Sequence, residues 1–241
     1  MQLHPRKTLA ALLVPVALMT LSCGSADDAS STTAKASDST TSTTSTSTAP
    51  STDPVESQST VQPEQAVWPF VADGTRFSDP TKLASSFATE YLGFVDPIAG
   101  EFQQGDSRSG EVAITTRADG PVTTVLVRQL DGDDWWVIGA TTPNLVIEAP
   151  AALASVTSPV TVSGQSTAFE GTINLEVRED GRLDPLAEGF TNGGANGQMG
   201  PFSTALNLNE GGSSAGAIIV KTLSAKDGSI DEASVVRVKF A

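Results

Sequence analysis

Hydrophobic and polar residues alternate along most of the C-terminal part of the chain. Residues 172–178 place Ile173, Leu175 and Val177 on one face, and residues 235–240 repeat this two-residue period. Residues 216–223 are apolar almost throughout, which is typical of a central strand. Shorter alternating runs lie between them, and turn residues separate all of these runs. Residues 145–241 therefore predict a β-sandwich of about seven strands, of the immunoglobulin type.

A helical period is found upstream of this region. Apolar residues recur at every fourth position in residues 83–91, after Asp79-Pro80, a favourable N-cap and first helical position, and before Gly93, a favourable C-cap. Three strand-like runs follow, over residues 111–117, 122–130 and 135–140. Residues 67–144 therefore predict a small α+β domain with one helix on a β-meander, and the chain as a whole is predicted to be mainly β.

The first 23 residues have the form of an export signal. Arg6 and Lys7 are followed by an apolar run, residues 9–21, that is too short to span a bilayer. The run ends at Leu21-Ser22-Cys23-Gly24, which resembles a bacterial lipoprotein signal. The resemblance implies that residues 1–23 form the signal, that Cys23 carries the lipid, and that the protein is held at the outer face of the cell membrane. The alternatives are a secretory signal without lipidation and a buried N-terminal helix.

Residues 24–66 are predicted to be a disordered linker. Serine and threonine make up 21 of these 43 residues, and large apolar side chains are almost absent. Such a segment buries too little apolar surface to offset the entropy lost on ordering. We expect a flexible tether that separates the folded part from the membrane, and O-glycosylation of its hydroxyl groups is the alternative to a plain spacer.

Composition narrows the possible functions. The single histidine is His4 and the single cysteine is Cys23. Removal of the signal takes away the histidine and lipidation occupies the thiol, which excludes Ser-His-Asp and Cys-His catalysis and zinc sites built on these residues. Loss of Arg6 and Lys7 leaves 12 basic and 28 acidic residues, a formal charge of about −16. A surface this acidic repels phosphate backbones, and we expect no nucleic-acid partner. We expect no catalytic residues, no metal site and no cofactor.

Several sequence motifs indicate a known family. Ser158-Pro159, Gly164, Phe169-Glu170-Gly171, the segment 200–202 and Asp227-Gly228-Ser229 occur in order across residues 145–241. Together they resemble the immunoglobulin-like domain of bacterial spore germination, a domain associated with the GerM module, which is not recognisable upstream here. The resemblance implies an immunoglobulin-like fold on an extracytoplasmic protein and brings no catalytic residues with it.

Adjacent tryptophans and a glycine-rich loop are the candidate binding features. Trp135 and Trp136 follow an Asp-Gly turn, and adjacent strand residues point to opposite faces, so we expect one ring in the core and the other exposed or packed against a neighbouring domain. The loop 190–200 contains Asn192 and Asn196, which are candidate surface residues. For Phe169-Glu170 we expect a core phenylalanine and a structural carboxylate.

Three functional hypotheses follow from these features. The first is a non-enzymatic, membrane-anchored envelope lipoprotein whose immunoglobulin-like domain binds another protein. The second is a cell-wall polysaccharide-binding protein that uses exposed tryptophans, with Trp68 added to Trp135 and Trp136. The third is a hydrolase that depends on aspartate or glutamate alone, which requires two carboxylates facing each other in a cleft.

Overall fold

A computed structural model describes residues 64–241 of the 241-residue chain. The predicted signal with Cys23, and the predicted linker up to residue 63, lie outside the described residues. The last linker residue, Ala66, is buried beside Trp136. Residues 64–241 belong to a single compact unit, and no helix in this described part is long and apolar enough to cross a membrane.

The helix forms where its period predicts it. Asp79 accepts hydrogen bonds from the backbone N–H groups of Thr81 (2.8 Å) and Lys82 (3.1 Å) and so caps α1 (Pro80–Ser86). A π-helical segment, η2 (Phe87–Leu92), continues α1 and ends at Gly93, which has a φ of 82°. A short 3₁₀ turn, η1 (Val71–Asp73), precedes both. The predicted apolar face of the helix is buried throughout.

The meander contains one strand more than predicted. Its strands are β1 (Ile98–Gln104), β2 (Ser109–Thr115), β3 (Thr123–Asp131) and β4 (Asp134–Thr141). The sequence did not predict β1, because it is an edge strand whose residues are mostly exposed and whose pairing with β2 shifts register. An edge strand of this kind lacks the one-sided burial that produces alternation.

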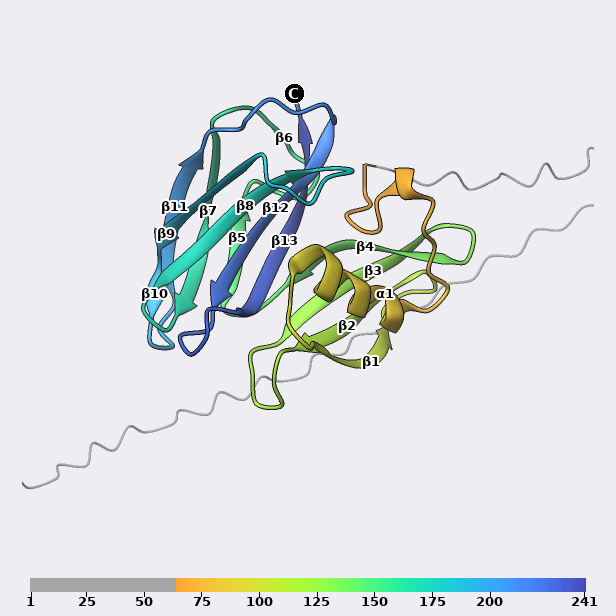
Figure 1. Cartoon of the computed structure of the whole chain (residues 1–241), viewed down its shortest axis with the longest axis horizontal. Helices are drawn as coiled ribbons and strands as arrows, with labels where there is room; N and C mark the ends of the chain where they lie inside the picture. The colour runs from red at the N-terminus through yellow and green to blue at the C-terminus, as the bar shows by residue number, and fades with distance from the viewer. Residues whose placement is uncertain (1–63) are drawn as a thin grey trace, which may run out of the picture. The chain divides into compact units, whose positions relative to one another are not determined.

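The C-terminal part is the predicted β-sandwich (Figure 1). Its strands are β5 (Leu145–Ala149), β6 (Ser155–Val156), β7 (Val160–Ala168), β8 (Thr172–Glu179), β9 (Ala187–Asn192), β10 (Gly194–Ala195), β11 (Gly200–Leu206), β12 (Ala215–Leu223) and β13 (Ile230–Phe240). In one layer β7 pairs with β5, β10 and β11. In the other, β12 lies between β8 and β13, and β9 pairs with β8. Apolar side chains from both layers form the core between them.

The meander and the sandwich share one sheet. The strand order β1-β2-β3-β4-β13-β12-β8-β9 is continuous, and Val235 of β13 pairs with Ala140 of β4. Side chains of β12 are buried on both faces: Ile218 packs into the sandwich core, whereas Ile219 packs into the core beneath the helix. This explains why the sequence of β12 is apolar almost throughout.

A buried arginine links the helix to the sandwich. The guanidinium of Arg178 on β8 donates a hydrogen bond to the backbone carbonyl oxygen of Tyr91 and lies 5.2 Å from the centre of the Tyr91 ring. Arg178 also pairs with Glu176, which in turn pairs with Lys221 of β12. The helix therefore covers the outer face of the sandwich sheet through polar as well as apolar contacts.

Gly164 has a different role from the one its position suggests. A glycine after an alternating run often marks a bend between strands, but Gly164 lies within β7. A Cβ atom there would lie 1.9 Å from the carbonyl oxygen of Val146 on β5. Glycine is therefore needed so that β5 can approach β7. Gly171, with a φ of 77°, does form the turn between β7 and β8.

Candidate functional site

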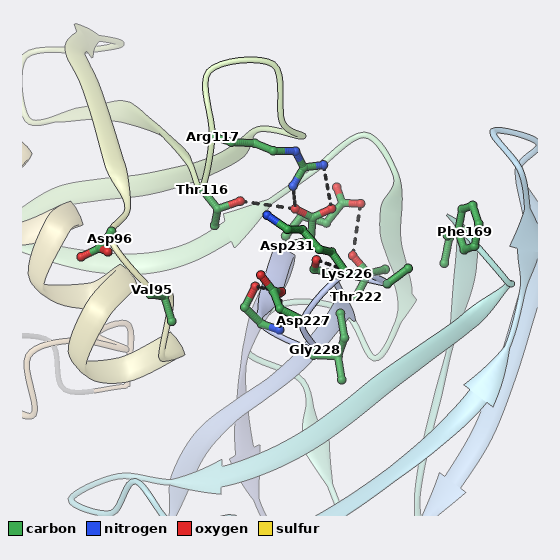
Figure 2. Close-up of a pocket in the computed structure, with 16 residues that line it drawn as sticks. Val95, Asp96, Thr116, Arg117, Phe169, Thr222, Lys226, Asp227, Gly228 and Asp231 are labelled. Carbon is green, nitrogen blue, oxygen red and sulfur yellow. Dashed lines mark hydrogen bonds and ion pairs between the residues drawn. The ribbon is translucent and has the colours of Figure 1, made fainter.

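A groove lies where turns of the sandwich meet the end of strand β2. It consists of two neighbouring cavities of about 950 and 590 Å³, which share Ala168, Phe169, Asp231 and Glu232 in their walls. We call it the junction groove. Figure 2 shows the larger cavity, with Arg117 and Thr116 approaching Asp231 and with Phe169 set apart from them. Volumes of this size are typical of ligand sites in proteins.

Turns from distant parts of the sequence form the walls of the junction groove. Arg117 follows β2, Phe169 follows β7, and the β12–β13 connection contributes the stretch from Ser224 to Ser229. That connection contains the Asp227-Gly228-Ser229 motif. Asp227 accepts hydrogen bonds from the hydroxyl (2.7 Å) and the backbone N–H (3.2 Å) of Ser229, which lower its pKa, and Gly228 has a φ of 73°. The turn is therefore held in one shape by its own side chains.

An ion pair crosses the larger cavity. The guanidinium of Arg117 binds both carboxylate oxygens of Asp231, and the Thr116 hydroxyl donates to the same carboxylate at 3.3 Å. The Arg117 side chain is half-exposed, so the pair contributes little to stability, about 1 kcal/mol or less. Its main effect is to fix Asp231 and to neutralise its charge.

Glu232 is the buried carboxylate of the junction groove. It is 4% exposed, and it accepts hydrogen bonds from the Thr142 hydroxyl, the Asn144 amide (3.1 and 3.2 Å) and the Thr222 hydroxyl (3.4 Å). Burial raises its pKa, and the negative charge of Asp231 acts in the same direction. Among the described residues it forms no ion pair with a basic side chain.

Exposed apolar side chains border the junction groove. Phe169 is 68% exposed, and Val95 and Leu223 are also exposed. The expectation of a core position for Phe169 was wrong, because Phe169 lies in the turn after β7, beyond the last residue of that strand. Glu170 beside it is exposed as well. The Phe-Glu-Gly motif thus presents an aromatic ring to solvent.

The three tryptophans do not form a binding surface. Trp135 packs beneath the helix and Trp136 packs on the opposite face of the meander, as the alternation predicts. However, Trp136 is fully buried under Ala66 and Val71, and Trp135 and Trp68 are 9% and 7% exposed. One ring was expected in the core and the other exposed or packed against a neighbouring domain; both rings are buried, and the segment before the helix covers Trp136. The exposed tryptophans that the polysaccharide-binding hypothesis requires are therefore not found among the described residues.

The two asparagines lie in different surroundings. Asn196 is exposed, has a φ of 53° and lines the smaller cavity. Asn192 ends β9 and forms a hydrogen bond with the Thr172 hydroxyl (3.2 Å), and it does not line either cavity. The structure thus brings Asn196 together with Phe169 and Glu232, and leaves Asn192 and the tryptophans elsewhere.

Sequence reasoning missed the main groove residues, Arg117, Asp231 and Glu232. One signal was present: Glu232 is in phase with Val236, Val238 and Phe240, the inward-facing residues of β13. A carboxylate at an inward-facing strand position requires partners. The partners themselves come from residues about 90 positions away (Thr142) and 10 positions away (Thr222), which no local pattern reveals.

Comparison with known proteins identifies the sandwich. Residues 144–229 match the family model described as the immunoglobulin-like domain of bacterial spore germination. This part of the chain is similar to the immunoglobulin-like domains of that family, and its fold is that of an immunoglobulin-like β-sandwich. Neither the comparison with curated proteins nor the comparison with solved structures found a match.

The immunoglobulin-like domain supplies most of the junction groove. Phe169, the β12–β13 turn and Asn144 all lie within the matched residues, whereas Arg117 and Val95 come from the helix-and-meander part. Within residues 64–241 no group of three or more histidine, cysteine, aspartate and glutamate side chains is placed to hold a metal ion. The residues that line the groove offer hydrogen-bonding, charged and apolar groups.

Proposed function

We propose that the protein is an exported, membrane-anchored lipoprotein whose immunoglobulin-like domain acts as a non-enzymatic interaction module, with the junction groove as its binding surface. The observation that carries this proposal is a groove on an immunoglobulin-like domain bordered by exposed apolar side chains, with Phe169 68% exposed. Aromatic side chains are enriched at protein interfaces, and exposed apolar side chains that lie together around a groove mark interaction sites.

The polar contacts of the groove support binding over catalysis. Arg117 holds the Asp231 carboxylate, and three polar side chains occupy both oxygens of Glu232. A carboxylate pair that acts on a glycosidic bond needs one acid and one base free to reach the substrate. The two adjacent acids of β13 instead serve as fixed parts of the wall.

The signal and the linker support the proposed location. Arg6-Lys7, the apolar run and Cys23 have the order of a lipoprotein signal, and the Ser/Thr-rich segment after Cys23 has the composition of a tether. The test is fractionation of cells that produce the native protein or its Cys23→Ala variant. We expect the native protein in the membrane fraction and the variant in the soluble fraction, whereas Ser22→Ala leaves the distribution unchanged. Equal partitioning of the native protein and Cys23→Ala contradicts the anchor.

Two equally exposed phenylalanines allow a matched test of the groove. Phe169 is 68% exposed and borders the groove, whereas Phe190 is 71% exposed and lies on β9 outside it. We expect a photo-cross-linking residue at position 169 to capture one defined protein in intact cells, and the same residue at position 190 not to capture it. The captured protein, once purified, should bind the native chain and bind Phe169→Ala more weakly. Equal capture from both positions, or none from 169, contradicts the proposed surface.

A further inference from the structure

Two of the six asparagines in the chain, Asn192 and Asn196, are followed directly by glycine. In an Asn-Gly pair the backbone nitrogen of the glycine can attack the side-chain amide carbon of the asparagine, because glycine has no Cβ atom to crowd the approach. The attack converts the asparagine to a carboxylate with water as the only other reactant. Since the two pairs are the same dipeptide, a difference in their reactivity comes from the fold.

The Asn196-Gly197 pair lies in an exposed turn. Asn196 and Gly197 have φ values of 53° and 78°, and the Gln198 N–H donates to the Ala195 carbonyl oxygen at 3.0 Å, as in a two-residue type I′ turn. Both central residues are exposed, and a Cβ atom at position 197 would meet no atom within 4 Å. The turn therefore has room for the Asn196 side chain to approach the peptide that follows it.

The peptide unit between Asn196 and Gly197 is not held by hydrogen bonds. Among the described residues, neither the Asn196 carbonyl oxygen nor the Gly197 N–H takes part in one. The bonds of the turn lie on either side, since the Asn196 N–H donates to the Ala168 carbonyl oxygen (3.0 Å) and Gln198 donates to Ala195. Rotation of this peptide unit brings the Gly197 nitrogen toward the Asn196 side chain and requires neither bond to break. Such local motion of an exposed turn costs little free energy.

The Asn192-Gly193 pair is held on both sides. The Gly193 N–H donates a hydrogen bond to the Gly171 carbonyl oxygen (2.9 Å), and the Asn192 side-chain oxygen accepts one from the Thr172 hydroxyl (3.2 Å). Asn192 also ends β9 and pairs with Thr172 of β8. Gly193 is closely packed, because a Cβ atom there would lie 1.8 Å from the Ser166 hydroxyl oxygen. Attack at this pair therefore requires the end of β9 to open.

We propose that Asn196 is a modification site, at which the folded protein deamidates spontaneously, and that Asn192 keeps its amide. In the first step a bond forms between the Gly197 nitrogen and the side-chain carbonyl carbon of Asn196. The bond from that carbon to the amide nitrogen breaks, and the proton of the Gly197 N–H leaves with the ammonia. Water then opens the resulting succinimide ring, and the product is aspartate or isoaspartate.

The modification changes the wall of the smaller cavity of the junction groove. Asn196 lines this cavity together with Asp119, Asp231 and Glu232. Deamidation adds a further carboxylate, which is ionised at neutral pH. Phe169 lies in the same wall, so the charge beside the proposed binding surface changes as the protein ages. The modification itself goes beyond the proposed function and does not depend on it, because it occurs whether or not position 169 captures a partner.

The test compares the two asparagines within one molecule. Full-length protein in detergent is incubated at neutral pH for several weeks, once folded and once in concentrated guanidinium chloride. Digestion and mass spectrometry with electron-transfer fragmentation locate the gain of about one mass unit and distinguish aspartate from isoaspartate. In the folded protein we expect Asn196 to be converted at least about tenfold faster than Asn192, because only Asn192 requires a strand end to open. In guanidinium chloride the two rates should be similar.

A variant gives a second readout. The side chain in Asn196→Gln is one methylene longer and closes a ring far more slowly, so conversion at position 196 should be lost while the rate at Asn192 stays the same. On ion-exchange chromatography the native protein should accumulate an acidic form with time, and Asn196→Gln should not. Equal rates at the two asparagines of the folded protein, or an acidic form that accumulates equally fast in Asn196→Gln, overturn the assignment. Conversion of Asn196 in guanidinium chloride but not in the folded protein overturns it as well.

Discussion

At the scale of single residues, burial and exposure in this protein differ from what side-chain type suggests. Trp136, the candidate for a binding surface, is fully buried, and Phe169, expected in the core, is 68% exposed. Alternation assigns a residue to one face of a strand but does not say what covers that face. For Trp136 the cover is the segment that contains Ala66 and Val71. Phe169 lies in a turn, where the strand period no longer applies.

Glu232 makes stability depend on pH. Burial raises its pKa in the folded protein above that in the unfolded chain, so the folded state favours the protonated form. This contribution to stability is fully present below the unfolded pKa and is lost as pH rises through the raised folded pKa. We expect Glu232→Gln to gain stability relative to the native protein as pH rises from 4 to 7. The measurement is the difference in unfolding free energy between the two proteins at several pH values.

Glu232→Gln replaces a carboxylate oxygen, which accepts a hydrogen bond, by an amide NH₂ group, which donates one, next to the Asn144 amide. The mismatch lowers the stability of the variant by an amount that does not depend on pH. For this reason the change with pH, rather than the absolute difference, is the test. A difference that stays the same from pH 4 to pH 7 shows that burial does not perturb Glu232. Asp231, which pairs with Arg117, is the other acid that faces Glu232 and is left unchanged in the comparison.

At the scale of elements, the contact between β4 and β13 joins the meander to the sandwich. Gly139 of β4 lies at this contact, and a Cβ atom there would be 2.9 Å from the carbonyl oxygen of Val235. A backbone carbonyl within a sheet has little room to move. The absence of a side chain at position 139 therefore allows the two strands to approach.

We expect Gly139→Ala to destabilise the protein by about 1–3 kcal/mol, the usual cost of overpacking. Gly212→Ala is the matched control, because a Cβ atom at position 212 meets no atom within 4 Å. The control should change the free energy of unfolding by about 0.5 kcal/mol or less. Both variants are unfolded in urea, and their free energies of unfolding are compared. The comparison holds when the slope of this free energy against urea concentration is the same for both variants. Equal free energies of unfolding for Gly139→Ala and Gly212→Ala would show that β4 does not pack closely against β13.

At the scale of the whole molecule, the two parts predicted from the sequence depend on each other. Ile219 and Ala217 of β12, and Val235 and Ala233 of β13, pack into the core beneath the helix. Without the helix-and-meander part, these side chains would lie on the open face of a sheet. The domain that the family match identifies is therefore completed here by residues outside the match.

We expect residues 64–241 to unfold in one cooperative transition. The two parts share one sheet and are joined by the Arg178–Tyr91 contact, so there is no boundary between them along which one part could unfold without the other. Calorimetry of the full-length protein tests this, because the measured enthalpy equals the van't Hoff enthalpy only for a two-state transition. Two resolved transitions, or a van't Hoff enthalpy near half the measured one, would show that the parts fold independently.

The sequence alone determined the helix and its caps, the strands with one-sided burial, and the family of the sandwich. Each of these depends on neighbouring residues: a 3.6-residue or two-residue period, a turn, or a short motif. The tertiary structure decided the shared sheet, the covering of Trp136, the partners of Glu232 and the junction groove. These depend on contacts between residues as far apart in the sequence as Arg117 and Asp231. A local pattern of residues does not show which distant faces of the structure contact each other.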